Sequence, residues 1–203
     1  MIDPHTPPPV GGATLSGVPV SASTSEAASA ADLDAVAELL GRVPRGVVGI
    51  AHRCRCGRPD VVETAPRLPD GTPFPTTYYL VDPFAASAIS TLEASGLMRR
   101  MQDRLAGDPE LAAAYAAAHE DYLSRRARLG SVEEIEGISA GGMPTRVKCL
   151  HALAGHALAA GPGVQPFGDE ALAQLAAGGG WPATCPHGDL AGVPGAEPPV
   201  EGA

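Results

Sequence analysis

Apolar side chains recur at helical spacing in several stretches of the chain. The stretch 31–42 predicts an amphipathic helix, because four of its apolar residues share one face. These residues are Leu33, Val36, Leu39 and Leu40. An Asp-Pro pair is a strong helix start, since Asp caps free N–H groups and Pro suits the first turn, and it occurs at 82–83 and 108–109. We therefore predict helices from both pairs, and further helices over 97–106, 144–160 and 169–177.

Three shorter stretches are rich in β-branched and aromatic residues and predict strands. They cover 46–52, 60–64 and 76–81. The first two are joined by the tight turn CRCGRP at 54–59, so they are expected to form a hairpin. The pattern therefore predicts an α+β fold, with a small antiparallel sheet of about three strands packed by roughly four to five helices.

Composition separates a folded core from two tails. Residues 1–30 and 178–203 are rich in Pro, Gly, Ala and small polar residues, and such stretches bury too little apolar surface to offset their ordering entropy. We expect the first tail to be disordered and the second to be mostly so, because the second also contains Trp181, Cys185 and His187. The region 31–177 is then a single globular domain.

The charge pattern narrows the range of partners. The formal net charge is −9, and no basic patch of the kind that binds nucleic acid or an anionic membrane is visible. The chain shows neither a signal peptide nor an apolar run long enough to span a membrane, so a cytoplasmic location is expected. The cysteines are then better interpreted as thiols or metal ligands than as disulfides. A protein partner stays open.

Several segments are distinctive when taken together. They are APRLPDGTPFPTTYYL at 65–80, TLEASGLM at 91–98, AAAHEDYL at 116–123, SAGGMPTRVKCLHALAGHALAAGPG at 139–163 and PFGDEAL at 166–172. With these segments the chain resembles the bacterial domain of unknown function 501 family over about residues 32–175. The resemblance implies no activity, cofactor, partner or catalytic residue, so the chemistry has to be inferred from the residues themselves.

The segment 141–163 predicts a binding site for a small anion, such as a phosphorylated metabolite. On a straight helix from Pro144, Lys148, His151 and Gly155 would share a narrow stripe, just beyond the pair Gly141-Gly142. A glycine-rich loop that opens a helix offers free N–H groups and the positive end of the helix dipole. The expected ligand-binding residues are Gly141, Gly142, Arg146, Lys148, His151 and Gly155. Lys148 is also the only lysine in an arginine-rich chain.

A thiolate metal site is the second hypothesis, and zinc is the expected ion. Cys54 and Cys56 sit in the hairpin turn, where two sulfur atoms could converge. Cys149 is the third candidate, and the fourth ligand would then come from the C-terminal tail. Cys149 and His151 point about 160° apart on a regular helix, so that geometry would not let them bind one ion together. The remaining Cys and His residues considered are His156, Cys185 and His187.

Catalysis is the least determined property. The candidate catalytic residues are His151, Lys148 and Cys149, the last because a cysteine near a helix N-terminus and beside a lysine is activated as a nucleophile. Whether the protein is an enzyme stays open. Three functions therefore remain: binding of a small anion, a thiolate metal site, and a protein-interaction module without a small-molecule site.

Overall fold

The computed structural model describes residues 25–187 and has the predicted α+β fold. Its four strands form one antiparallel sheet in the order β1-β2-β3-β4. The strands are β1 (Glu26–Ala27), β2 (Val47–Arg53), β3 (Pro59–Thr64) and β4 (Tyr78–Leu80). The three strands expected from the sequence are thus present, and the short β1 joins them by pairing with β2.

The helices follow the predicted positions closely, with one exception described below. They are α1 (Ala30–Leu40), α2 (Pro83–Ala94), α3 (Leu97–Gly107), α4 (Pro109–Ala127), α5 (Leu150–Ala160) and α6 (Pro166–Ala177), with a 3-10 turn, η1, at Glu133–Ile135. The side chains of Asp82 and Asp108 cap α2 and α4, as the Asp-Pro pairs predict. In the described range, no helix has both the length and the apolar character needed to cross a membrane.

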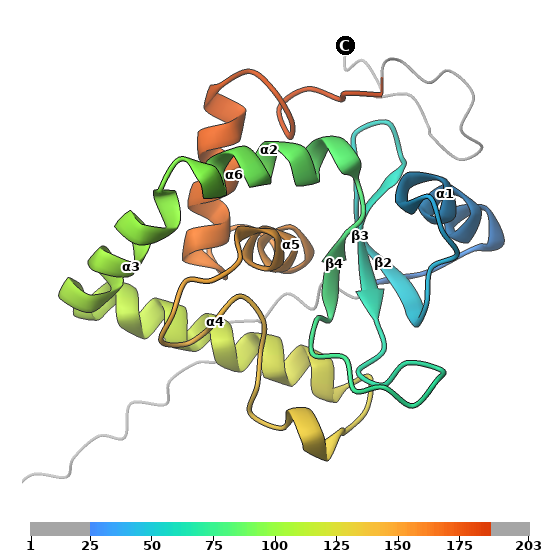
Figure 1. The fold of residues 1–203 in the computed structure, drawn as a ribbon, viewed down its shortest axis with the longest axis horizontal. Helices are drawn as coiled ribbons and strands as arrows, with labels where there is room; N and C mark the ends of the chain where they lie inside the picture. Colours follow the sequence, from blue (N-terminus) through green and yellow to red (C-terminus); the bar gives the residue numbers. More distant parts are fainter. Residues whose placement is uncertain (1–24, 188–203) are drawn as a thin grey trace, which may run out of the picture.

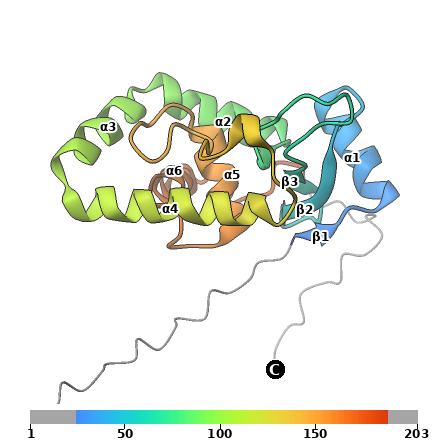
Figure 2. The ribbon, with the colours of Figure 1, turned by 90° about the horizontal axis from the view of Figure 1, so that it is seen from below.

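Helices cover both faces of the sheet. Figure 1 shows α1 on one side of the strands and the other helices on the opposite side, and Figure 2 shows the same arrangement from below. Successive side chains of β3 point to opposite faces of the sheet. Val61 packs into the large helical core, whereas Val62 packs with Val36 of α1. Every residue of β3 is buried, because both of its faces are covered.

Helix α5 lies at the centre of the helical side, against β4 and α6 (Figure 1). Its approach to both neighbours depends on glycine. A Cβ atom on Gly155 would lie 3.1 Å from the backbone oxygen of Tyr78 in β4, and one on Gly168 of α6 would lie 2.7 Å from Cβ of Ala157. Small residues at these positions therefore let the backbones of α5, α6 and β4 approach closely.

The predicted helix start at Pro144 is wrong, because α5 begins at Leu150. The preceding residues form a loop that closes on itself: the Lys148 N–H donates to the Gly141 oxygen at 2.8 Å, and the Arg146 N–H donates to the Gly142 oxygen at 2.9 Å. Both glycines have positive φ, 68° and 93°, which breaks a helical path. Two of the N–H groups of this segment are thus satisfied inside the loop, and the Val147 N–H donates instead to Gln102 Oε1 of α3.

The described residues include segments on both sides of the expected domain 31–177. At the start, β1 pairs with β2, and Ser29 caps α1 through the Asp32 N–H. At the end, residues 178–187 fold back across the molecule, and Trp181 is only 5% exposed within the large core. The rest of the two predicted tails, 1–24 and 188–203, lies outside the described residues.

Candidate metal centre

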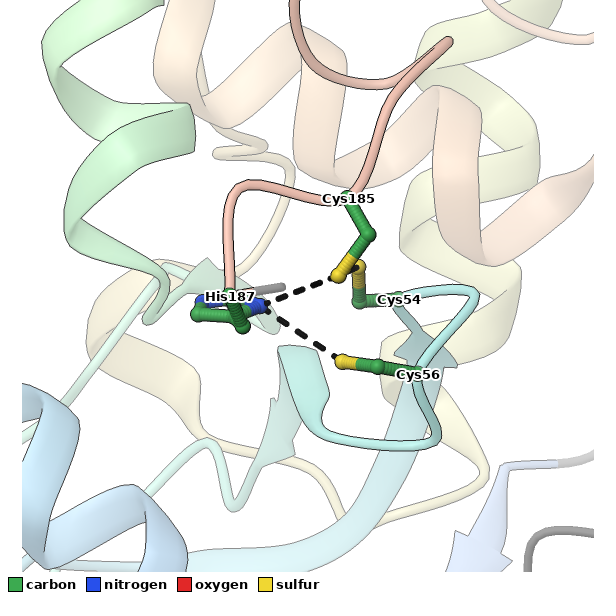
Figure 3. A group of neighbouring side chains, drawn as sticks. All are labelled: Cys54, Cys56, Cys185 and His187. Atoms are coloured by element: carbon green, nitrogen blue, oxygen red, sulfur yellow. Dashed lines mark hydrogen bonds between the residues drawn. The ribbon is translucent and has the colours of Figure 1, made fainter. Parts of the chain in front are cut away.

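Four potential metal ligands meet where the β2–β3 turn faces the end of the described chain. They are Cys54, Cys56, Cys185 and His187, and their ligand atoms all lie within 4.8 Å of one another. Figure 3 shows the three sulfur atoms and the imidazole pointing toward one another. We call these four residues the Cys3His group. It joins two segments that are 131 positions apart in the sequence.

The tight turn between β2 and β3 supplies the first two ligands. The Cys54 N–H donates to the Arg58 oxygen and the Gly57 N–H donates to the Cys54 oxygen, both at 2.8 Å. Gly57 takes a positive φ of 86°, a conformation that glycine adopts without strain. Arg53 stabilises the turn, because its guanidinium donates a hydrogen bond to the Gly57 oxygen. The turn therefore holds Cys54 and Cys56 in a fixed loop at the end of a hairpin.

The segment after α6 supplies the other two ligands. Trp181 is buried in the core, and the Arg55 guanidinium of the turn donates to the Ala183 oxygen at 2.9 Å. These contacts bring the chain over the turn just before Cys185. His187 follows two residues later, and its ring meets Phe84 edge-on, with 5.6 Å between the ring centroids.

Asp82 orients the imidazole of His187. The carboxylate is fully buried, and its Oδ1 already accepts the N–H groups of Phe84 and Ala85 as the cap of α2. Its Oδ2 lies 2.7 Å from His187 Nε2, at ion-pair distance, and within the described residues neither atom makes a hydrogen bond. A carboxylate beside Nε2 favours a proton on that nitrogen, which leaves the lone pair of a neutral imidazole on Nδ1. Nδ1 is the atom that faces the sulfur atoms.

The distances within the group match a tetrahedral zinc site. Zn–S bonds of about 2.3 Å and Zn–N bonds of about 2.0–2.1 Å place sulfur atoms about 3.8 Å apart, and sulfur and nitrogen about 3.6 Å apart. In the structure, Cys54 Sγ and Cys185 Sγ are 3.5 Å apart, and His187 Nδ1 lies 3.5 Å from Cys56 Sγ and 3.6 Å from Cys185 Sγ. None of the four cysteines, all of which lie within residues 25–187, forms a disulfide. The residues present therefore fit a four-coordinate ion.

The thiols of Cys54 and Cys185, which lie next to each other in the group, differ in pKa. Burial raises the pKa of Cys54 to about 12. Burial also opposes ionisation of Cys185, but the hydrogen bonds that its sulfur makes with the His187 backbone N–H and the neighbouring thiols lower its pKa to about 7. Without a cation, the group thus combines a buried neutral thiol with one that ionises near neutral pH.

The structure brings together only part of the predicted metal set. Cys54 and Cys56 converge, and residues of the predicted C-terminal tail complete the group. Cys149 is not a member, since it lies in a separate group with Glu93 and His151. His156 is buried in the core, with its Nε2 2.9 Å from Asp121 Oδ2. Asp82 was missed as a site residue, because its Asp-Pro pair signals only a helix start.

The residues predicted to bind an anion do not form the expected stripe. Lys148 is exposed and lies in the loop before α5, where its Cγ packs close to Gly142. Gly155 faces β4 rather than a ligand, and the N–H of Leu150 at the start of α5 donates to Glu93 Oε1 at 2.7 Å. The protein's own carboxylate thus lies where the sequence analysis expected an anion. Arg146 is exposed, and anion binding at this loop stays a prediction.

The comparisons with known proteins place the chain in a family. The model of the family described as "Protein of unknown function (DUF501)" matches residues 50–173, as the resemblance suggested. The match includes the turn with Cys54 and Cys56, and it ends before Cys185 and His187. None of the curated proteins and none of the solved structures compared with the chain matches it. The chain therefore belongs to the DUF501 family.

Proposed function

We propose that this protein is a zinc protein in which one Zn²⁺ ion is held by the Cys3His group. The observation that carries the proposal is the pairing of buried Asp82 with His187 Nε2. Metal-bound histidines nearly always donate their second ring N–H to a carboxylate or a carbonyl, which fixes the tautomer and raises the basicity of the ligand nitrogen. Here that partner is present, and the free nitrogen is directed at three thiols.

The donor set favours zinc and a structural role. Sulfur and imidazole ligands suit zinc, whereas oxygen ligands would favour magnesium or calcium. Four protein ligands fill a tetrahedral shell and leave no position for a substrate, which is typical of structural rather than catalytic zinc. The ion would therefore bind residues 178–187 to the β2–β3 turn. The free energy of zinc binding would then stabilise the folded position of that segment.

The fastened segment also closes one wall of a cavity. A cavity of about 230 Å³ lies beside the Cys3His group, with Trp181 and Pro182 on the C-terminal side and His52 and Asp60 on the sheet side. His52 Nδ1 lies 2.7 Å from the buried Asp60 carboxylate. Under the proposal, the ion controls the shape of this cavity by holding its C-terminal wall in place.

The proposal is tested by the metal content of the protein purified without chelators. We expect about one zinc per chain by elemental analysis, and Cys56→Ser should lose it because Cys56 is a ligand at the half-exposed side of the group. Cys149→Ser is the matched control: it also removes one thiol, but from outside the group, so it should keep its zinc.

Two results would contradict the proposal. One is protein that contains no zinc and takes up none when excess zinc is added to the reduced chain. The other is equal loss of zinc in the Cys56→Ser and Cys149→Ser variants. Iron in place of zinc would keep the site but correct the identity of the ion.

A further inference from the structure

A second group of reactive side chains lies at the start of α5, apart from the Cys3His group. Glu93 of α2, Cys149 and His151 have ligand atoms within 4.8 Å of one another, and all three are half-buried. On a regular helix Cys149 and His151 would point in opposite directions. They meet because Cys149 precedes α5, as its N-cap, with extended backbone angles of φ −152° and ψ 106°.

Both ring nitrogens of His151 face acceptors. Nδ1 lies 3.3 Å from Glu93 Oε1, and Nε2 lies 3.0 Å from the backbone oxygen of Ala86 and 3.3 Å from the Ser90 hydroxyl. A carbonyl and an ionised carboxylate only accept and a hydroxyl can accept, so a ring protonated on both nitrogens, an imidazolium, satisfies all three oxygens. The hydrogen bond with the Cys149 sulfur, supported by Ala86 and Glu93, raises the pKa of His151 to about 9 against the opposing effect of burial.

This cation lies beside the sulfur of Cys149. The hydrogen bond from His151 lowers the pKa of the Cys149 thiol, and the nearby Ala152 N–H at the start of α5 acts in the same direction. Burial and the negative charge of Glu93 oppose the shift but do not cancel it. The adjacent Lys148 is exposed, and Glu93 and His151 are the charged groups that face the sulfur.

The same contacts argue against a second metal ion. A histidine ligand needs a free lone pair on one ring nitrogen, and both nitrogens of His151 are directed at oxygen acceptors of the protein. Glu93 Oε1 is also occupied, since it accepts the Leu150 N–H at 2.7 Å. Glu93 therefore positions the start of α5 and the imidazolium, and the thiolate remains the reactive atom.

We infer that Cys149 is a nucleophilic thiolate, paired with the His151 imidazolium, that undergoes thiol–disulfide exchange with small disulfides. The Cys149 sulfur attacks one sulfur of a disulfide R–S–S–R, a new S–S bond forms between Cys149 and R–S, and the other R–S leaves as a thiolate. The protein thiol is oxidised and the leaving thiol is reduced, so the electrons balance. In the described chain, the other cysteines belong to the Cys3His group, and the product is a mixed disulfide with the small thiol.

The experiment uses 2,2′-dithiodipyridine, a neutral disulfide whose released thiopyridone absorbs light. The chain as purified is mixed with the reagent between pH 5 and pH 9, and the trace of Cys149→Ser, purified in the same way, is subtracted so that only Cys149 is followed. We expect a reaction phase that is missing in Cys149→Ser and a mass increase on the peptide that contains Cys149. As the pH is raised, the rate of this Cys149 phase should begin to increase at a lower pH than the rate of a free cysteine derivative does.

The variant His151→Gln tests whether Cys149 reacts because the imidazolium activates its thiol or only because the thiol is exposed. Glutamine keeps hydrogen-bonding capacity but has no charge, so at pH 6.5 the Cys149 phase should slow by about tenfold, because the thiol loses the cation that lowers its pKa. Above about pH 9 the two proteins should react at similar rates, since both thiols are then ionised. A merely structural role of His151 would not change the pH profile in this way.

Three results would overturn the inference. The first is a native Cys149 phase with the pH profile of the free cysteine derivative, a comparison that holds even if His151→Gln does not fold. The second is an unchanged profile in folded His151→Gln. The third is a second zinc per chain that Cys149→Ser removes, which would make the thiol a metal ligand. None of these results depends on whether the Cys3His group binds zinc.

Discussion

At the scale of single residues, Asp82 joins the fold to the candidate site. One carboxylate oxygen caps α2 and the other lies beside His187, so a single buried side chain contacts both a helix start and a candidate metal ligand. Asp108 provides a natural comparison. It caps α4 through the N–H groups of Glu110 and Leu111 and precedes a proline in the same way, but it touches no residue of the Cys3His group.

Asp82→Asn should weaken zinc binding without removing the helix. Asparagine is as good an N-cap as aspartate, so α2 keeps its start. The uncharged amide no longer supports the His187 N–H, and loss of such a partner typically costs about 10–100-fold in metal affinity. Competition with a chelator of known affinity measures the change. Asp108→Asn should leave the affinity at its native value, and equal affinities in the two variants would refute the role of Asp82.

The sequence reveals single residues only where their chemistry does not depend on distant contacts. Cys54 and Cys56 could be recognised, because two cysteines in a tight turn converge wherever the turn lies. Asp82 could be read only as a cap, since the approach of His187 is a tertiary contact. Lys148 was assigned to a helix that starts after it, so its predicted neighbours were wrong.

At the scale of elements, the packing of α5 against β4 and α6 decides the architecture of the helical side. The two glycines at these contacts were visible in the sequence, but Gly155 was interpreted as room for a ligand. In the structure the space beside it is filled by the backbone of Tyr78. The position of Gly155 on the helix face indicates that another group approaches the backbone of α5 closely. It does not reveal whether that group is a ligand or a strand.

Gly168→Ala should destabilise the fold. The added methyl would meet backbone of α5 at Leu153 and lie 2.7 Å from Cβ of Ala157, so α6 must move away. Overpacking of this kind typically costs about 1–3 kcal/mol in the free energy of unfolding. Gly107 at the end of α3 is the matched control, because a Cβ there has nothing within 4 Å, and Ala should stabilise the protein slightly. Urea unfolding of both variants tests this, and equal stabilities would contradict the packing account.

Most elements were predictable because their signals are local. The Asp-Pro pairs gave the starts of α2 and α4, and the β-branched stretches gave β2, β3 and β4. The start of α5 was not predictable in this way. It depends on the hydrogen bond between Gly141 and Lys148 in the loop, and on the Glu93 carboxylate, which accepts the Leu150 N–H. The strand β1 has only two residues, too few for an alternating pattern to be read.

At the scale of the whole molecule, the position of the segment 178–187 depends on contacts that its composition does not reveal. Its composition is typical of disorder, because it lacks a periodic apolar face. It is held instead by a few specific contacts: buried Trp181, the bond from Arg55 to Ala183, and the meeting of Cys185 and His187 with the turn. A metal ion at that meeting point would supply the largest of these contributions.

The most direct test of this account is the fluorescence of Trp181, the only tryptophan in the chain, as zinc is removed and restored. The indole is buried in the structure, so the emission of the zinc-loaded protein should be that of a residue in an apolar core. We predict that a chelator shifts the emission toward that of a water-exposed indole, that added zinc reverses the shift, and that Cys149→Ser behaves in the same way. Cys56→Ser should show the exposed emission from the start. If elemental analysis shows that the zinc has gone while the emission of Trp181 stays unchanged, the ion does not hold the C-terminal segment in place.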